Sequence, residues 1–282
     1  MVRLLSSGKS IFAALLAGCV VCAHAAPQAF PIKISPGPNP PEAKRIANYP
    51  DAIGAIVWVI VNKLGLPAPR GTLEVHATRE SFERALVEHL KITPVLAQST
   101  AQFAKSAVGG HTVLVNAPAV ADSTWPQRIE LLAHELAHCE QLTLANRPAL
   151  SRPQWLIEGY AEWIAFKVTD ALGLDNLAGA RQRKIAKLRK LRRERELPKL
   201  VLIVSFSEWV EARQTYGFDG TYSLAFLATD FLIRRHSPLD AADYFRRFEH
   251  SDDDAANFHA AFGEDLGNFE HALDRHLDSL LR

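Results

Sequence analysis

The chain has 282 residues, 48% of them hydrophobic, and a formal net charge of +1. This composition is that of an ordinary globular protein and excludes disordered and fibrous classes. The balanced charge argues against a strongly basic nucleic-acid-binding protein, so no nucleic-acid partner is expected. The length allows one large domain or two small ones, and either can bury a core.

Residues 1–25 have the pattern of a secretory signal peptide. A positively charged start precedes an apolar stretch over residues 11–22, and Ala23-His24-Ala25 is an A-x-A cleavage pattern. Cleavage is expected after Ala25 or Ala26. The protein is therefore expected to be exported to the periplasm or cell envelope.

A second interpretation of this segment stays open. Leu16-Ala17-Gly18-Cys19 resembles a bacterial lipoprotein signal, in which Cys19 would carry a lipid anchor. If simple cleavage occurs instead, Cys139 is the one cysteine left, and no internal disulfide is expected. Cys139 follows a histidine directly on a predicted helix, so it points about 100° away from that neighbour. We expect it to be a small buried apolar side chain.

Residues 26–41 are rich in proline and predict an extended tether. The rest, 42–282, is predicted to be one domain, with a mixed part over 42–148 and a helical part over 149–282. In the mixed part, the apolar segment 49–69 is a buried helix or strand. Alternation predicts a strand at 71–78, helical spacing follows at 79–91, and a second strand is expected at 109–118. We expect this second strand to lie at a sheet edge, where it could hold an extended peptide.

The patterns after residue 118 are almost all helical. Pro126 begins a helix that runs to about Ala145, and a second helix is expected between Ser151 and Gly173. A basic helix over 181–199 is expected to be a solvated face, with contact to anionic lipid or an acidic partner as the alternative. The last elements are predicted as helices at 206–216 and 219–236 and two short helices. Strands before helices predict an α+β fold.

The helix that begins at Pro126 contains His134-Glu135-Leu136-Ala137-His138, the pattern H-E-x-x-H. The two histidines are four residues apart, so they share one face, and a metal ion would give both imidazoles a partner. A catalytic zinc site takes three protein ligands, and Glu158 follows His138 after 19 intervening residues. That spacing lets a second helix return alongside the first. Glu162 lies one turn later and could accept a hydrogen bond from the far nitrogen of a ligand histidine.

The H-E-x-x-H pattern, followed by Trp155-Leu156-x-Glu158-Gly159-x-Ala161, resembles the gluzincin metallopeptidases. It is similar to the peptidase-MA-like group and to zinc aminopeptidases, although no exopeptidase signature is present. The resemblance implies a zincin-like fold, with a small N-terminal sheet packed on the H-E-x-x-H helix and a helical C-terminal part. It implies one zinc ion bound by His134, His138 and Glu158, with Glu162 at the position of a supporting acid.

The resemblance also implies catalytic roles. Glu135 is the expected general base for water, which zinc would activate. Segment 220–232 resembles the aminopeptidase segment that begins with the catalytic tyrosine, which indicates Tyr222 as the donor to the oxyanion. Tyr216 is the alternative. The expected function is a monomeric, exported zinc metallopeptidase acting on peptide or protein substrates. The alternative is a catalytically silent relative that binds a cell-envelope partner or peptide.

Overall fold

The computed structural model describes residues 26–33, 42–148, 150 and 153–282. This part of the chain forms ten α-helices, three short 3-10 helices and one four-stranded sheet. The predicted α+β class is therefore confirmed, and helices dominate. The expected signal peptide, including Cys19, lies outside the described residues. Within them, no helix combines the length and hydrophobicity that crossing a membrane requires.

The sheet has the strand order β1-β2-β4-β3. Strands β2 and β4 are the two that were predicted from the sequence, and they run parallel. β1 pairs antiparallel with β2, and β3 pairs antiparallel with β4. The strand bounds are Gln28–Pro31 for β1, Thr72–His76 for β2, Ser106–Gly109 for β3 and Thr112–Asn116 for β4.

Two expectations about the sheet were wrong. β4 is an internal strand, because β3 turns back on it through a two-residue connection at Gly110, whose φ is +58°. β3 is the edge strand, and its four residues were too few to show alternation. β1 lies in the segment expected to be a tether, so that part of the segment belongs to the sheet, as the opposite edge.

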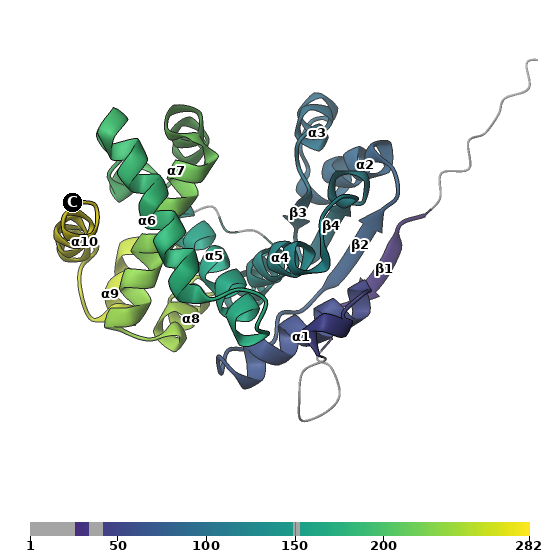
Figure 1. Ribbon diagram of the computed structural model, residues 1–282, viewed down its shortest axis with the longest axis horizontal. Coiled ribbons are helices and arrows are strands. Elements are labelled where there is room, and N and C mark those ends of the chain that lie inside the picture. Colours follow the sequence, from purple (N-terminus) through teal and green to yellow (C-terminus); the bar gives the residue numbers. More distant parts are fainter. Residues whose placement is uncertain (1–25, 34–41, 149, 151–152) are drawn as a thin grey trace, which may run out of the picture.

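Helices cover both faces of the sheet (Figure 1). Leu73, Val75 and Val113 share a core with α1 and α4, while Leu114, from the other face, packs with α2 and α3. The segment 49–69 therefore contributes a helix, which Asn48 caps by accepting a hydrogen bond from the amide of Asp51. The bounds are Ala43–Arg45 for η1, Tyr49–Asn62 for α1, Arg79–Leu90 for α2, Pro94–Ala101 for α3, Pro118–Val120 for η2 and Trp125–Ala145 for α4.

The helical part starts with α5 and α6, and its long helix α7 contains a break. Gly217 has φ 75° and ψ 160°, which separates the two helices that the sequence predicted there. Three helices follow α7 instead of two, because Gly263 ends α9 in a left-handed conformation before α10 begins. The bounds are Gln154–Ala171 for α5, Leu177–Glu194 for α6, Leu200–Leu202 for η3, Phe206–Arg235 for α7, Pro238–Arg247 for α8, Asp254–Phe262 for α9 and Leu266–Leu280 for α10.

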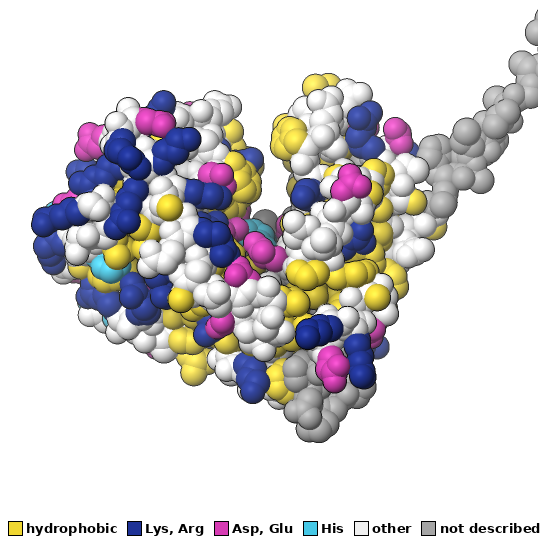
Figure 2. Space-filling model, viewed as in Figure 1, with side chains coloured by type: hydrophobic (Ala, Val, Ile, Leu, Met, Phe, Trp, Pro, Cys, Tyr) yellow, Lys and Arg dark blue, Asp and Glu magenta, His cyan; other side chains and the backbone are white. Residues whose placement is uncertain are grey.

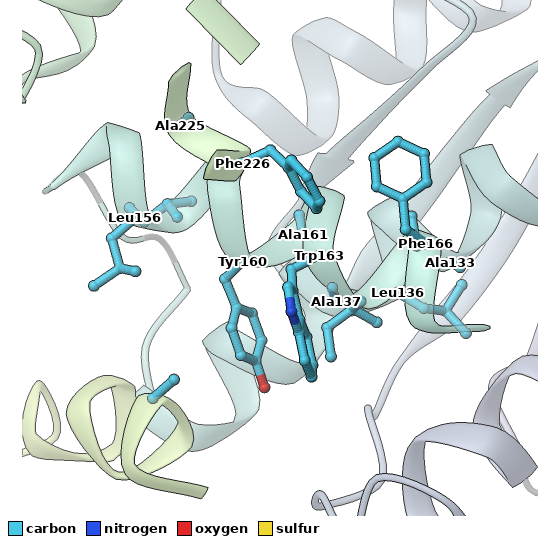
Figure 3. Close-up of a cluster of buried hydrophobic side chains, with 14 of the residues drawn as sticks. Ala133, Leu136, Ala137, Leu156, Tyr160, Ala161, Trp163, Phe166, Ala225 and Phe226 are labelled. Carbon is cyan, nitrogen blue, oxygen red and sulfur yellow. The ribbon is translucent and has the colours of Figure 1, made fainter. Parts of the chain in front are cut away.

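Helix α5 lies between α4 and α7 at the centre of the molecule. Figure 3 shows Tyr160, Ala161 and Trp163 of α5 among apolar side chains of α4 and α7. Gly159 allows the close approach of α7, since a Cβ there would lie 2.3 Å from Thr229 Oγ1 and 2.4 Å from the Ala225 carbonyl oxygen. This packing fixes the position of the neighbouring residue on α5, Glu158.

A cleft divides the molecule into two lobes (Figure 2). The sheet, α2 and α3 form one lobe, and α6 and α7 belong to the other, with α4 running below the gap (Figure 1). Figure 2 shows histidine and acidic side chains at the floor of the cleft and apolar side chains on both walls.

Candidate metal centre

Helix α4 presents the two histidines of the H-E-x-x-H pattern on one face. A capping box of Thr124 and Gln127 begins this helix, and Pro126 occupies its first turn. His134 and His138 lie one turn apart, with their Nε2 atoms 3.1 Å from each other and their ring planes at 83°. Both imidazoles therefore direct the same nitrogen toward one point.

Helix α5 brings Glu158 to that point. Its Oε2 atom lies 3.4 Å from His134 Nε2 and 3.7 Å from His138 Nε2. The structure thus brings together the three residues that the sequence selected as ligands. The three residues meet because α5 runs back along α4, which the spacing between the two motifs had predicted.

The three donors could hold a metal ion. Their ligand atoms all lie within 4.8 Å of one another. A tetrahedral ion with ligands at about 2.0–2.1 Å places each ligand pair about 3.3–3.4 Å apart, close to the distances of this cluster. Glu158 Oε2 is buried and has no hydrogen-bond partner, so it is free to coordinate. About 15% of each ligand side chain is exposed, which leaves an approach from solvent.

The charges of the cluster favour a cation. Burial lowers the pKa of His138, but Glu158, together with Glu135 and Gln141, outweighs burial and raises this pKa to about 9. Burial raises the pKa of Glu158, yet His138 and His134 hold it well below its usual range. A metal ion bound here would displace a proton from His138 and keep Glu158 ionised.

Two side chains lie behind the histidines. His138 Nδ1 is 2.9 Å from Gln141 Oε1, and Gln141 Nε2 donates to the carbonyl of Ile157 at 2.8 Å. Glu162 Oε1 lies 3.6 Å from His134 Nδ1, the position expected for it but longer than a hydrogen bond. Gln141 was not predicted, although its place three residues after His138 puts it on the same face.

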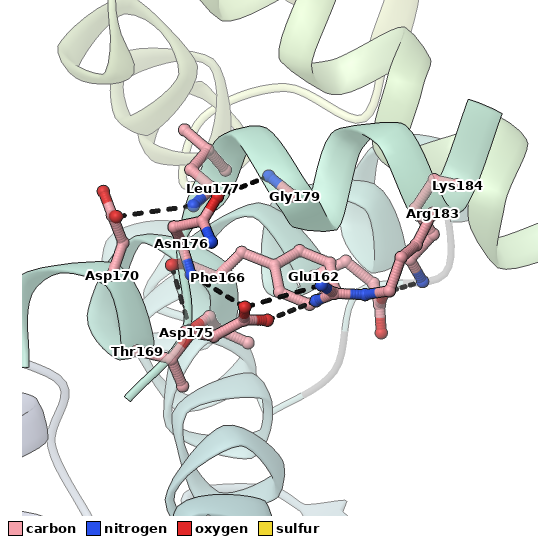
Figure 4. A network of polar contacts seen from close by, with 11 residues as sticks. Glu162, Phe166, Thr169, Asp170, Asp175, Asn176, Leu177, Gly179, Arg183 and Lys184 are labelled. Carbon is pink, nitrogen blue, oxygen red and sulfur yellow. Dashed lines mark hydrogen bonds and ion pairs between the residues drawn. The ribbon is translucent and has the colours of Figure 1, made fainter. Parts of the chain in front are cut away.

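Lys184 of α6 contacts the Glu162 carboxylate that lies behind His134. Its Nζ donates to Glu162 Oε2 at 2.5 Å and lies 5.2 Å from the centre of the Phe166 ring (Figure 4). The basic segment 181–199 was expected to be solvated, but the Lys184 side chain is only 12% exposed. It faces α5, where Glu162 holds it.

Glu135 projects toward the sheet. Its Oε1 accepts a hydrogen bond of 2.7 Å from Ser106 Oγ, at the start of the edge strand β3. Ser106 was not predicted, because 29 residues separate it from Glu135 and β3 was not expected as a strand. Cys139, which directly follows His138, is a free buried cysteine as expected, and burial raises its pKa to about 12.

The two candidate tyrosines lie in different surroundings. The Tyr222 ring centroid is 6.3 Å from that of His134, and the ring packs against Trp209 and Phe218. Burial, with Glu158 as the next cause, raises the Tyr222 pKa well above its usual value, so its hydroxyl stays a donor. Tyr216 instead lies under the guanidinium of Arg195, 5.9 Å from its ring. Of the two, Tyr222 is therefore the one placed beside the histidines.

Comparisons of the chain with models of protein families, with curated proteins and with solved structures found no match.

Proposed function

We propose that the protein is a zinc-dependent metallopeptidase of the gluzincin type, with a zincin-like fold. The observation that carries the proposal is the convergence of His134, His138 and Glu158, with Glu135 next to the first ligand. Two imidazoles and one carboxylate are a ligand set of catalytic zinc sites, which keep one position open. When bound, zinc would act as a Lewis acid that polarises a carbonyl and lowers the pKa of water to about 7.

The protein's own residues supply proton transfer and charge stabilisation. Glu135 would take a proton from the attacking water and deliver it to the leaving amine. The Ser106 hydroxyl holds one oxygen of this carboxylate in place. Tyr222 remains protonated and would donate a hydrogen bond to the developing oxyanion.

The edge strand β3 is the best candidate to hold an extended substrate. It contacts α4 and positions Ser106 beside Glu135, and in the described sheet it pairs only with β4. Its other side offers backbone groups that a peptide could pair with as an added strand. The peptide-binding role expected for β4 therefore belongs to β3 in this proposal.

The first experiment measures bound metal and peptide hydrolysis of the purified protein beside Glu135→Gln. We expect one zinc per chain in both proteins and cleavage of a broad peptide library by the wild type. The variant should lose about 10²–10⁴-fold in rate, because proton transfer by a positioned base contributes that much. Zinc without hydrolysis would favour the alternative, a silent relative that binds an envelope partner. A protein that holds no zinc would refute both.

We also propose that the protein is exported and is a monomer. Mass spectrometry of the mature protein from a native host would show cleavage after Ala25 or Ala26, or a lipid on Cys19.

A further inference from the structure

One arginine of helix α7, Arg213, has no acidic partner among the described residues. Arg213 belongs to the first half of α7, and its Nε atom is buried with no hydrogen-bond partner. Among the described residues, none of the ion pairs involves this side chain, whereas several other arginines of the helical part, such as Arg181 and Arg235, pair with carboxylates. A buried donor without a partner costs free energy, so an acceptor supplied by a ligand would stabilise this guanidinium.

Arg213 is connected to the metal centre through two aromatic rings. Its Cζ atom lies 5.2 Å from the centre of the Phe218 ring, and Phe218 stacks on Tyr222 at 4.0 Å. Tyr222 in turn lies beside His134. The positive charge of Arg213 also acts on Tyr222, where it opposes the effect of Glu158 on the hydroxyl pKa. The Phe218 ring therefore lies between the Arg213 guanidinium and the ring of Tyr222, the proposed oxyanion donor.

Helix α7 exposes large apolar side chains before and after Arg213 in the sequence. Phe218 is 55% exposed and Phe206, at the start of α7, is 64% exposed. The opposite lobe carries a second exposed group on and after α3, which includes Leu96 and Phe103. Phe103 precedes by three residues the serine that holds Glu135. Figure 2 shows apolar side chains on both walls of the cleft.

We propose that Arg213 binds a carboxylate of the peptide substrate, beside apolar side chains that pack on Phe218. This inference rests on the proposed peptidase function and names its substrate class: peptides with bulky apolar residues and a carboxylate near the scissile bond. The carboxylate belongs either to the peptide's C-terminus or to an acidic side chain. A planar guanidinium stacked on a ring suits either one, because it can donate two parallel hydrogen bonds.

The test measures binding of paired peptides to zinc-loaded Glu135→Gln protein by fluorescence anisotropy. One pair shares an apolar sequence and ends in a free carboxylate or a carboxamide. The second pair ends in a carboxamide and carries Glu or Gln at one internal position. Arg213→Gln and Arg213→Lys are made in the same background. Arg235→Gln is the matched control, since Arg235 also lies over a ring of α7, at 5.4 Å from Phe231, but pairs with Glu264.

We expect one carboxylate peptide to bind about tenfold more tightly than its neutral twin, and the pair that shows this identifies the source. Arg213→Gln should abolish that preference and leave the affinity for the neutral twin within about twofold. Arg213→Lys should retain part of the preference, and Arg235→Gln should retain all of it. If the wild type cleaves no peptide but this preference for the carboxylate peptide is still observed, the peptidase proposal would be refuted and the carboxylate-binding role of Arg213 would stand. Equal affinities within both pairs, or an Arg213→Gln loss equal for acid and neutral peptides, would overturn the inference.

Discussion

Replacing Lys184 by Met should weaken metal binding even though Lys184 cannot touch the metal. The lysine holds Glu162 Oε2 at 2.5 Å, while Oε1 of the same carboxylate faces His134 Nδ1 at 3.6 Å. Methionine keeps an unbranched apolar stem over Phe166 and removes only the charge. The Glu162 carboxylate then loses its cation and is free to turn away from the histidine.

The size of the effect follows from the exposure of the pair. The Lys184 and Glu162 side chains are 12% and 17% exposed. Breaking a fully buried pair costs about 3–5 kcal/mol, and an exposed pair is worth at most about 1 kcal/mol, so roughly 1–3 kcal/mol of stability is expected here. Removing an orienting partner of a ligand histidine costs about 10–100-fold in metal affinity. Lys184 contacts Glu162 and not the histidine itself, so we expect a smaller loss of zinc affinity, roughly three- to tenfold.

The assay is competition for zinc with a chromophoric chelator at constant pH, together with urea unfolding. Lys187→Met is the matched control, because Lys187 is on the same helix and pairs with Asp219 at 2.6 Å, with side chains 43% and 69% exposed. It should leave zinc affinity unchanged. Adding Lys184→Met to Glu162→Gln should weaken zinc binding no further. An unchanged zinc affinity in Lys184→Met, combined with lower stability, would refute a positioning role for this lysine.

Two further predictions concern Tyr222, which packs beside His134, and Glu140, which lies on α4. Tyr222→Phe should lower kcat by about 10²–10³-fold with zinc content unchanged, since it removes one donor to the oxyanion, and an unchanged kcat would reject this role. Glu140→Gln should stabilise the protein at neutral pH. Burial raises the pKa of Glu140 from 4.5 to about 8, although the Tyr160 hydroxyl opposes the shift. Between these values the folded state binds more protons than the unfolded state, so the wild type loses stability as pH rises from about 4.5 to about 8. The amide keeps an acceptor for Tyr160 and should gain roughly 3 kcal/mol at pH 7 in urea unfolding, but little at pH 4.5. A gain of the same size at both pH values would contradict the assignment.

The parts of the site that follow from local geometry could be predicted from the sequence. His134 and His138 share a face because they are four residues apart on one helix. Predicting Glu158 as a ligand required one assumption about the tertiary structure, that α5 returns along α4. The number of residues between the two motifs supported it. The neighbour of Glu158, Gly159, was noted only as part of a motif, and its close contact with α7 became visible in the structure.

The missed residues all depend on contacts between elements distant in sequence. Ser106 reaches Glu135 only because β3 lies at the edge of the sheet beside α4. Lys184 belongs to a segment whose basic composition indicates solvent, and its burial follows from the packing of α6 over α5. Arg213 carries no local pattern at all. Its relation to Tyr222 arises where α7 breaks at Gly217.

Helix α4 shows why residue type alone cannot assign roles. It carries glutamates at 130, 135 and 140, and a spacing of five turns each by about 140° from the one before. Helical geometry therefore predicts that the three carboxylates face different surroundings, but it cannot tell which surroundings these are. Glu130 is partly buried beside a carboxylate of α5, and both burial and this neighbour raise its pKa. Glu140 is fully buried with one hydroxyl partner, Tyr160. Glu135 accepts a hydrogen bond from the Ser106 hydroxyl, and of the three it is the one that directly follows a candidate ligand histidine, His134. The fold around α4, as well as its place in the motif, therefore makes Glu135 the proposed general base.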